Sequence, residues 1–216
     1  MSSVRVKICG ITRKEDLDAA IVAGADAVGF VVGVDSSPRN IALEKAEKLI
    51  RQVPPFMKSV LVTVPKSIDE CGTYEKLNPD AIQIHGENLH AAASVRLKFP
   101  NILMIGAVNA NLATTVDVVS QASKIFDAVL LDSFYDGRYG GTGIVHDWEL
   151  SKRVKQAIHP KPLILAGGLN PENVAEAVRT VEPYAVDVSS GVESHPGIKD
   201  YQKIVEFIKN AKAVKV

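Results

Sequence analysis

Short apolar runs alternate with longer amphipathic segments along this chain, and the alternation occurs eight times. The apolar runs are rich in β-branched residues and almost continuous, which is typical of parallel strands buried on both faces. The predicted strands are 4–9, 26–32, 58–64, 80–84, 102–108, 126–131, 162–166 and 184–189.

The segments between these strands have helical periodicity. In 41–52, for example, apolar residues recur at the spacing of one helix face. The predicted helices lie near 13–23, 41–52, 67–76, 88–98, 112–123, 148–158, 172–180 and 198–210. A weak internal repeat is also present, since an Asp-Ala pair opens three of the strands, at Asp26, Asp80 and Asp127.

Eight βα units within 216 residues predict an α/β protein made of one (β/α)8 TIM barrel domain over residues 1–216. The alternative is an open, doubly wound sheet, but such sheets normally have fewer strands and need a switch point. No low-complexity linker divides the chain. In a barrel, the functional side chains lie at the carboxyl ends of the strands and in the loops that follow them.

Composition and charge exclude several classes of protein. The formal net charge is zero and no long basic run occurs, so the charge pattern of a nucleic-acid binder is missing. The chain shows neither a secretory apolar region nor the ~20 apolar residues that span a bilayer. Its two cysteines lie far apart, which suits a reducing cytosol. We therefore expect a cytoplasmic monomer or homodimer with no nucleic-acid or membrane partner.

Candidate functional side chains gather where the predicted strands end. They are Cys9, Gln83, His85, Asp132 and Asp187. Alternation along the eighth strand places Asp187 and Ser189 on one face, pointing into the barrel. Of the five histidines, only His85 lies at a strand end, so the sequence predicts no metal site.

Glycine-rich stretches follow the sixth, seventh and eighth strands. Glycine lets backbone N–H groups approach a phosphate closely, and the last two loops are the usual phosphate site of a TIM barrel. Asn170-Pro171 also predicts the N-cap and first residue of the next helix. The alternative is that these glycines only form turns. We predict a phosphate site made by Gly141, Gly143, Gly167, Gly168, Ser189, Ser190 and Gly191.

Several short motifs, in chain order, resemble one known family. They are KICGIT at 7–12, SPR at 37–39, QIHG at 83–86, LLDS at 130–133, GGTG at 140–143, AGGLNPENV at 166–174, VDVSSGVE at 186–193 and GIKD at 197–200. Together they resemble the phosphoribosylanthranilate isomerases of tryptophan biosynthesis. The resemblance implies a TIM barrel without a cofactor and a small phosphorylated substrate. The implied reaction is an Amadori rearrangement of N-(5′-phosphoribosyl)anthranilate to 1-(o-carboxyphenylamino)-1-deoxyribulose 5-phosphate.

The resemblance implies that Cys9 is the general base and Asp132 the general acid. The chemistry agrees, because opening the furanose ring needs a proton on the ring oxygen and the next step removes a proton from C2′. We expect burial to raise the pKa of Asp132 and keep it protonated. Cys9 must be a thiolate, so we expect a nearby cation or helix dipole to lower its pKa. Lys7 lies one layer deeper on the same strand face and is not assigned this role.

The remaining residues suit a phosphorylated aromatic acid as substrate. We expect Arg39 to bind the anthranilate carboxylate in a bidentate pair, the alternative being a solvated loop arginine. Gln83 and His85 are expected to line the pocket, although His85 equally fits a buried core histidine. Asp187 is expected to bind sugar hydroxyls. Cys71 is interpreted as a packing residue.

Three other functions are weighed against this one. The isomerase of the histidine pathway performs the same rearrangement with two aspartates, whereas the first strand here ends in Cys9. A metal-dependent pentose-phosphate epimerase would need several histidine and aspartate ligands. A non-catalytic sensor of phosphoribosyl ligands would have lost its acid or base, and both Cys9 and Asp132 are present.

Overall fold

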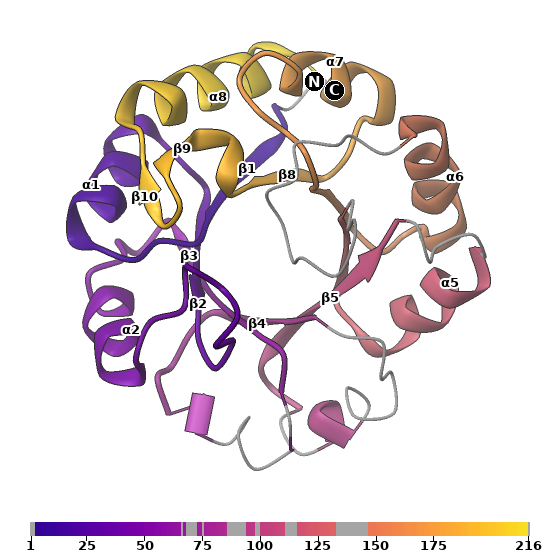
Figure 1. The fold of residues 1–216 in the computed structure, drawn as a ribbon. Helices are drawn as coiled ribbons and strands as arrows, with labels where there is room; N and C mark the ends of the chain where they lie inside the picture. The colour runs from indigo at the N-terminus through magenta and orange to yellow at the C-terminus, as the bar shows by residue number, and fades with distance from the viewer. Residues whose placement is uncertain are drawn as a thin grey trace.

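Eight parallel strands close into a barrel in the computed structural model (Figure 1). The structure describes residues 3–65, 67, 73–74, 76–85, 94–97, 100–110, 116–132 and 147–215. Each strand pairs with the next along the chain, and β8 pairs with β1 to close the ring. The strands are β1 (Arg5–Cys9), β2 (Ala27–Val31), β3 (Lys58–Thr63), β4 (Ala81–His85), β5 (Leu103–Asn109), β6 (Ala128–Asp132), β7 (Leu163–Leu165) and β8 (Ala185–Val188). The predicted TIM barrel is confirmed.

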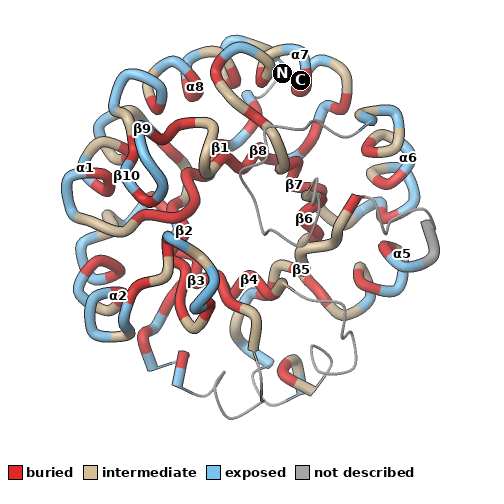
Figure 2. Tube along the Cα trace, viewed as in Figure 1, coloured by how far each residue is buried: buried red, intermediate tan, exposed pale blue. Residues whose placement is uncertain are grey.

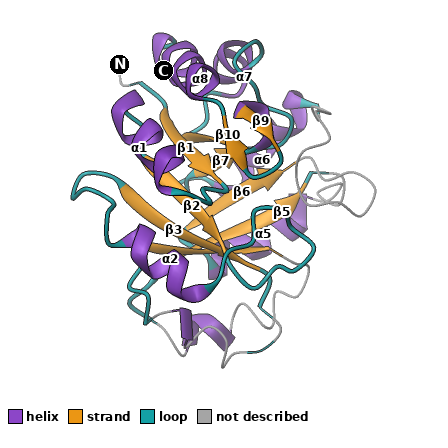
Figure 3. Cartoon of the chain, turned by 60° about the vertical axis from the view of Figure 1, so that its left-hand side comes forward, coloured by secondary structure: helices purple, strands orange, loops and turns teal. Residues whose placement is uncertain are grey.

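Helices form a shell around the strands, as the turned view in Figure 3 shows. They are α1 (Lys14–Ala23), α2 (Leu43–Ile50), α5 (Val116–Ile125), α6 (Trp148–Ile158), α7 (Val174–Val181) and α8 (Tyr201–Ala213). After β8 the chain forms a 3₁₀ turn, η1 (Ser190–Val192), and a short hairpin of β9 (Glu193–His195) and β10 (Ile198–Lys199). The helices predicted near 67–76 and 88–98 lie largely outside the described residues.

The start of α7 differs from the prediction. The helix begins at Val174, and its N-cap residue is Asn173 rather than Asn170. The side chain of Asn170 instead accepts hydrogen bonds from the N–H groups of Glu172 and Asn173, each at 3.0 Å. Its carboxamide therefore stabilises the turn before the helix, which explains why an N-cap signal occurs there.

Side-chain alternation gives each strand an outer and an inner face. On β1, Val6 and Ile8 belong to the large core between the barrel and the helices, whereas Cys9 belongs to a separate cluster inside the barrel. Figure 2 shows the result: the barrel strands are mostly buried, and exposed residues lie mainly on the helices, in loops and at the first residue of β1, β3 and β5. Because both strand faces are buried, the strands read as continuous apolar runs.

The Asp-Ala repeat has an architectural role at the amino ends of the strands. Asp26, Asp80 and Asp127 each lie just before a strand, and each carboxylate accepts a backbone N–H from the preceding strand at 2.8 Å. The donors are Val6, Ser59 and Met104. The repeat therefore ties neighbouring strands together at the end of the barrel opposite Cys9.

Candidate active site

The inner face of the barrel brings the predicted strand-end residues together. On β4, Ile82 and Ile84 belong to the outer core, so Gln83 and His85 point inward. On β6 and β8, the same alternation turns Asp132 and Asp187 inward, since their neighbours Leu131 and Val186 belong to the outer core. The interior at the carboxyl ends of the strands thus holds side chains from β1, β4, β6 and β8.

A buried ion pair lies beneath the candidate base. Lys7 Nζ donates a hydrogen bond to Asp187 Oδ1 at 2.9 Å, and the two side chains are 4% and 9% exposed. The two residues are direct neighbours in the register of β1 and β8. Burial alone would lower the pKa of Lys7, but the charges of Asp187 and Cys9 outweigh it, so this pKa is raised and Lys7 carries a positive charge.

The thiol of Cys9 has a raised pKa, contrary to the expected lowering. Burial is the largest cause, because a thiolate loses its hydration inside the barrel. The charges of Lys7 and Lys199 oppose this effect, and Asp187 adds to it. Cations are therefore present near Cys9, as expected, and Lys7 is one of them. In this structure, however, burial raises the pKa of the thiol by more than these cations lower it.

Asp132 closes β6, where its backbone carbonyl accepts the N–H of Ala110 at 2.7 Å. Burial first, and the nearby charge of Asp187 second, raise the pKa of its side chain to about 6, while Lys7 opposes the shift. This direction agrees with the acid that the sequence predicts. Its Oδ1 atom is buried and has no hydrogen-bond partner among the described residues, so it is available to a bound molecule.

Gln83 and His85 form one contact on β4. Gln83 Nε2 lies 2.7 Å from His85 Nε2, so this ring nitrogen accepts the amide proton. Burial, followed by the charge of Lys7, lowers the pKa of His85 to about 4, and the ring is neutral at pH 7. With Nε2 as acceptor, the proton of the neutral ring is on Nδ1, which can donate a hydrogen bond without adding charge.

Arg39 is buried and already engaged with a carboxylate. Its Nε and Nη2 atoms donate to the two oxygens of Glu193 at 2.8 and 2.7 Å. Lys199 Nζ reaches the same carboxylate at 2.9 Å and the carbonyl of Ser189 at 3.1 Å. This geometry excludes the solvated loop arginine. Binding of the substrate carboxylate by Arg39 stays a prediction, for which Nη1 is the nitrogen that Glu193 leaves open.

Lys199 was not predicted as a site residue from the sequence, and Glu193 was assigned no definite role there. Both lie after β8, within the motifs GIKD and VDVSSGVE, so membership of these motifs was the available signal. Burial lowers the pKa of Lys199 although Glu193 opposes it. Burial acts to raise the pKa of Glu193, but Arg39 and Lys199 outweigh it, so this pKa is lowered and the side chain is a carboxylate. The cluster adds a net positive charge next to Cys9.

The loops after β7 and β8 touch each other at the rim. Gly167 and Gly168 have φ of 83° and 65°, the left-handed region that glycine enters without strain. Gly191 is not in that region, but a Cβ there would lie 2.0 Å from the carbonyl oxygen of Leu169. Glycine at 191 is therefore required by close approach of the two loops and not by a turn. Ser189 and Ser190 lead into this contact through η1.

Three of the predicted residues cannot be placed in the site. Gly141, Gly143 and Cys71 lie outside the described residues.

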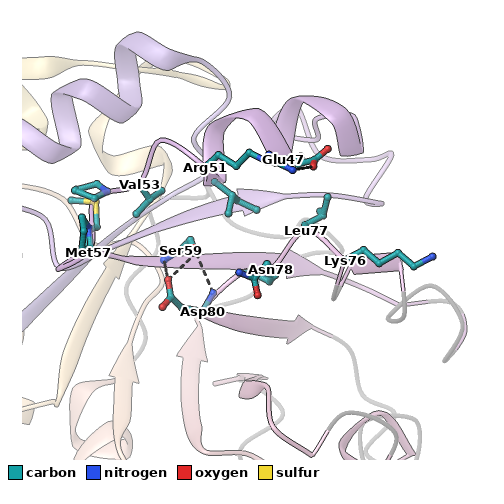
Figure 4. Close-up of a pocket in the computed structure, with 13 residues that line it drawn as sticks. Glu47, Arg51, Val53, Met57, Ser59, Lys76, Leu77, Asn78 and Asp80 are labelled. Carbon is teal, nitrogen blue, oxygen red and sulfur yellow. Dashed lines mark hydrogen bonds and ion pairs between the residues drawn. The ribbon is translucent and has the colours of Figure 1, made fainter.

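A cavity of about 610 Å³ is present at the opposite end of the barrel, beside the start of β3 and β4 (Figure 4). In it, Asp80 bonds to the N–H and hydroxyl of Ser59 at 2.8 and 2.9 Å. None of the predicted site residues lines this cavity, so shape alone does not locate the active site.

A closed (β/α)8 barrel with a half-buried acid and a buried thiol at the carboxyl ends of its strands has the organisation of a TIM-barrel enzyme. Comparison with known proteins narrows this class. The family model described as N-(5′-phosphoribosyl)anthranilate (PRA) isomerase matches residues 6–210. The chain belongs to this family, and it is an isomerase of tryptophan biosynthesis.

Individual relatives match over nearly their whole length. The N-(5′-phosphoribosyl)anthranilate isomerase of Pseudomonas fluorescens is 46% identical over 210 residues, which cover 96% of this chain and 98% of that protein. The crystal structure of the Thermotoga maritima enzyme matches with a TM-score of 0.84 at 38% identity, covering 98% and 100% of the two chains. An isomerase bound to reduced 1-(o-carboxyphenylamino)-1-deoxyribulose 5-phosphate matches with a TM-score of 0.80, at the same identity and coverage.

Within the described residues, no helix has the length and apolarity required to cross a membrane.

Proposed function

We propose that this barrel converts N-(5′-phosphoribosyl)anthranilate to 1-(o-carboxyphenylamino)-1-deoxyribulose 5-phosphate, with Asp132 as general acid and Cys9 as general base. The observation that carries the assignment of roles is the pair of environments at the barrel mouth. Asp132 has a pKa raised to about 6 and a free oxygen, whereas Cys9 lies beside the ammonium group of Lys7. The acid is thus biased toward its protonated form, and the base has a cation to stabilise its anion.

The first step needs the proton of Asp132. Protonating the furanose ring oxygen breaks its bond to C1′ and leaves an iminium ion between C1′ and the anthranilate nitrogen. Burial raises the pKa of Asp132 to about 6, so the free enzyme keeps a fraction of this side chain protonated at neutral pH. Substrate binding excludes more water, so we expect the pKa of Asp132 to rise further in the complex.

The second step needs the thiolate of Cys9. It takes the proton from C2′, the C–H electron pair forms the C1′–C2′ double bond, and the iminium nitrogen becomes neutral. The resulting enolamine tautomerises to the aminoketose product. Cys9 on β1 and Asp132 on β6 belong to different sides of the barrel wall, which suits proton transfers at the ring oxygen and at C2′.

Two ends of the substrate require separate binding groups. The glycine-rich contact between the loops after β7 and β8 is the expected phosphate site. The cations of Arg39 and Lys199 are suited to anionic groups, with Arg39 assigned to the anthranilate carboxylate. Asp187, which is fixed by Lys7, is assigned to a sugar hydroxyl. The related isomerase that holds the reduced product supports a ligand with these groups.

Replacement of Cys9 by alanine tests the assignment. The change removes one sulfur atom from a side chain that is 7% exposed, so we expect Cys9→Ala to fold normally. General base catalysis contributes roughly 10²–10⁴-fold, and we expect single-turnover rates on the anthranilate substrate to fall by that factor. Circular dichroism verifies the fold, and Cys71→Ala is the matched control for removal of a thiol. Near-parental turnover in folded Cys9→Ala would refute the base assignment.

A further inference from the structure

We propose that Lys7 is a positioning residue for Cys9: anchored by Asp187 in the space that Gly29 leaves, it stabilises the thiolate form of the base. The inference rests on the proposed function only in calling Cys9 the base. The coupling between the ammonium and the thiol is a property of the protein without substrate.

The side chains of Cys9 and Lys7 both lie next to the position that a side chain at Gly29 would occupy. Gly29 on β2 is the register neighbour of Cys9 on β1. A Cβ at Gly29 would lie 2.8 Å from Cys9 Sγ and 3.2 Å from both Cε and Nζ of Lys7. Any side chain at this position would therefore displace the thiol and crowd the ammonium group. Glycine in a strand interior, which weakens a strand, is explained by this close approach.

Asp187 fixes the ammonium group at that point. Lys7 Nζ bonds to Asp187 Oδ1 at 2.9 Å and also contacts the thiol of Cys9. A lysine side chain that is 4% exposed and paired on one side has lost most of its rotamer freedom. Its charge is thus held next to the sulfur before substrate binds, so little reorganisation is needed when the thiolate forms.

The other charges around Cys9 do not replace Lys7. Asp187 from β8 raises the pKa of the thiol, and Lys199 from β10 lowers it, but Lys199 is bound to Glu193. β2 presents Gly29, which has no charge. After burial, Lys7 is the largest influence on this thiol and the largest that favours the anion. Without it, burial and Asp187 would both act against the thiolate.

The test measures the ionisation of Cys9 directly, by its alkylation with iodoacetamide as a function of pH. A Cys71→Ala background leaves Cys9 as the only thiol, because the chain has two cysteines. We expect Lys7→Met to move the inflection to higher pH and to slow alkylation near neutral pH about tenfold or more, since one pKa unit is tenfold in thiolate. Lys7→Arg, which keeps the charge, should stay closer to the parent than Lys7→Met does.

Lys58→Met is the matched control. Lys58 also pairs with an aspartate, Asp80, at 2.7 Å, but at the other end of the barrel, and its loss should leave the alkylation profile unchanged. An inflection that stays at the parental pH in folded Lys7→Met would overturn the proposal.

Lys7→Met leaves the carboxylate of Asp187 buried without its partner, and this variant could fail to fold for that reason. A second variant keeps the proposal testable in that case. Lys7→Met/Asp187→Asn removes both charges, and the thiol inflection should still lie above that of the parent because the influence of Lys7 exceeds that of Asp187. An unchanged or lower inflection contradicts the proposal. A fully active Cys9→Ala would refute the base assignment alone, since the alkylation profile would still report the coupling.

Discussion

The two ends of the barrel carry ionisable groups in opposite ways. At the amino ends of the strands, three aspartates each accept a backbone N–H and face a cation, and their side chains are 34% to 40% exposed. The pairs are Lys212 with Asp26, Lys58 with Asp80, and Arg96 with Asp127. At the carboxyl ends, Lys7, Cys9, Asp132 and Asp187 are packed inside the wall, and a carboxylate oxygen of Asp132 is left without a partner among the described residues.

The difference separates groups that stabilise the fold from groups that serve chemistry. An exposed, hydrogen-bonded carboxylate keeps most of its hydration and contributes modestly to stability. A buried and incompletely paired group destabilises the native state, and it persists where a bound molecule completes its interactions. The cavity at the amino ends is lined by groups whose hydrogen bonds are made, such as Asp80 with Ser59. Its polar groups are therefore of the kind that stabilises the fold and not of the kind that serves chemistry.

The largest effect is expected for the acid at the carboxyl end. Asp132→Asn keeps the shape of the side chain but cannot release a proton, so we expect kcat to fall by roughly 10²–10⁴-fold. The affinity for reduced product should change little, because binding does not need the proton. Steady-state rates and titration with the reduced product separate the two quantities. A large loss of affinity with kcat intact would make Asp132 a binding residue and not the acid.

The same substitution should stabilise the protein at neutral pH. The folded-state pKa of Asp132 is raised from 3.8 to about 6, so its favourable contribution is complete below 3.8 and is lost as pH rises through 6. Asparagine does not ionise. The free energy of unfolding of Asp132→Asn should therefore gain roughly 2 kcal/mol on the parent between about pH 4 and pH 7. Urea unfolding at the two pH values measures the gain, and a constant difference would contradict it.

A smaller effect is expected at the rim. In Gly191→Ala the new Cβ would meet the carbonyl of Leu169 at 2.0 Å, so the loops after β7 and β8 must separate. We expect inorganic phosphate to inhibit this variant at least about tenfold more weakly, or about 1.4 kcal/mol. Gly24→Ala, at the end of α1 with φ of 82°, is the matched control, because it should lower stability without altering phosphate inhibition. Equal inhibition in Gly191→Ala would place the phosphate elsewhere.

The fold was predictable because the pattern of apolar and polar residues within each segment indicates whether that segment is a strand or a helix. Each strand is an almost continuous apolar run, and the first, fourth and sixth runs end at Cys9, His85 and Asp132, which could therefore be placed on the inner rim. Alternation along the eighth strand placed Asp187 on the same face. Alternation also placed Lys7 one layer below Cys9. What it did not predict is which charges meet across strands, because register between β1 and β8 is set by barrel closure.

Three features of the site depend on such long-range contacts. The pairing of Arg39 with Glu193 joins residues 154 positions apart, and Lys199 completes the cluster from β10, where the sequence predicts the start of a helix. The raised pKa of Cys9 reflects burial by the whole barrel, which neither a motif nor a nearby lysine reports. Gly191 was predicted as part of the phosphate site, and nothing in the sequence indicated its close approach to the carbonyl of Leu169.

The smallest effect is expected for Asp80, at the amino ends of the strands. Replacing it should change the free energy of unfolding in the opposite direction to the replacement of Asp132. Lys58 and Ser59 lower the pKa of Asp80 although burial opposes them, so its contribution to stability is present above its unfolded pKa and is lost as pH falls. Asp80→Asn should therefore reduce the free energy of unfolding at pH 7 by about 1 kcal/mol, a value discounted for its exposure to water. The deficit should shrink below about pH 4, and kcat should stay at the parental value. Urea unfolding and steady-state rates test both parts. If Asp80→Asn altered kcat, or if it stabilised the protein as Asp132→Asn is expected to do, the division between the two ends of the barrel would not hold.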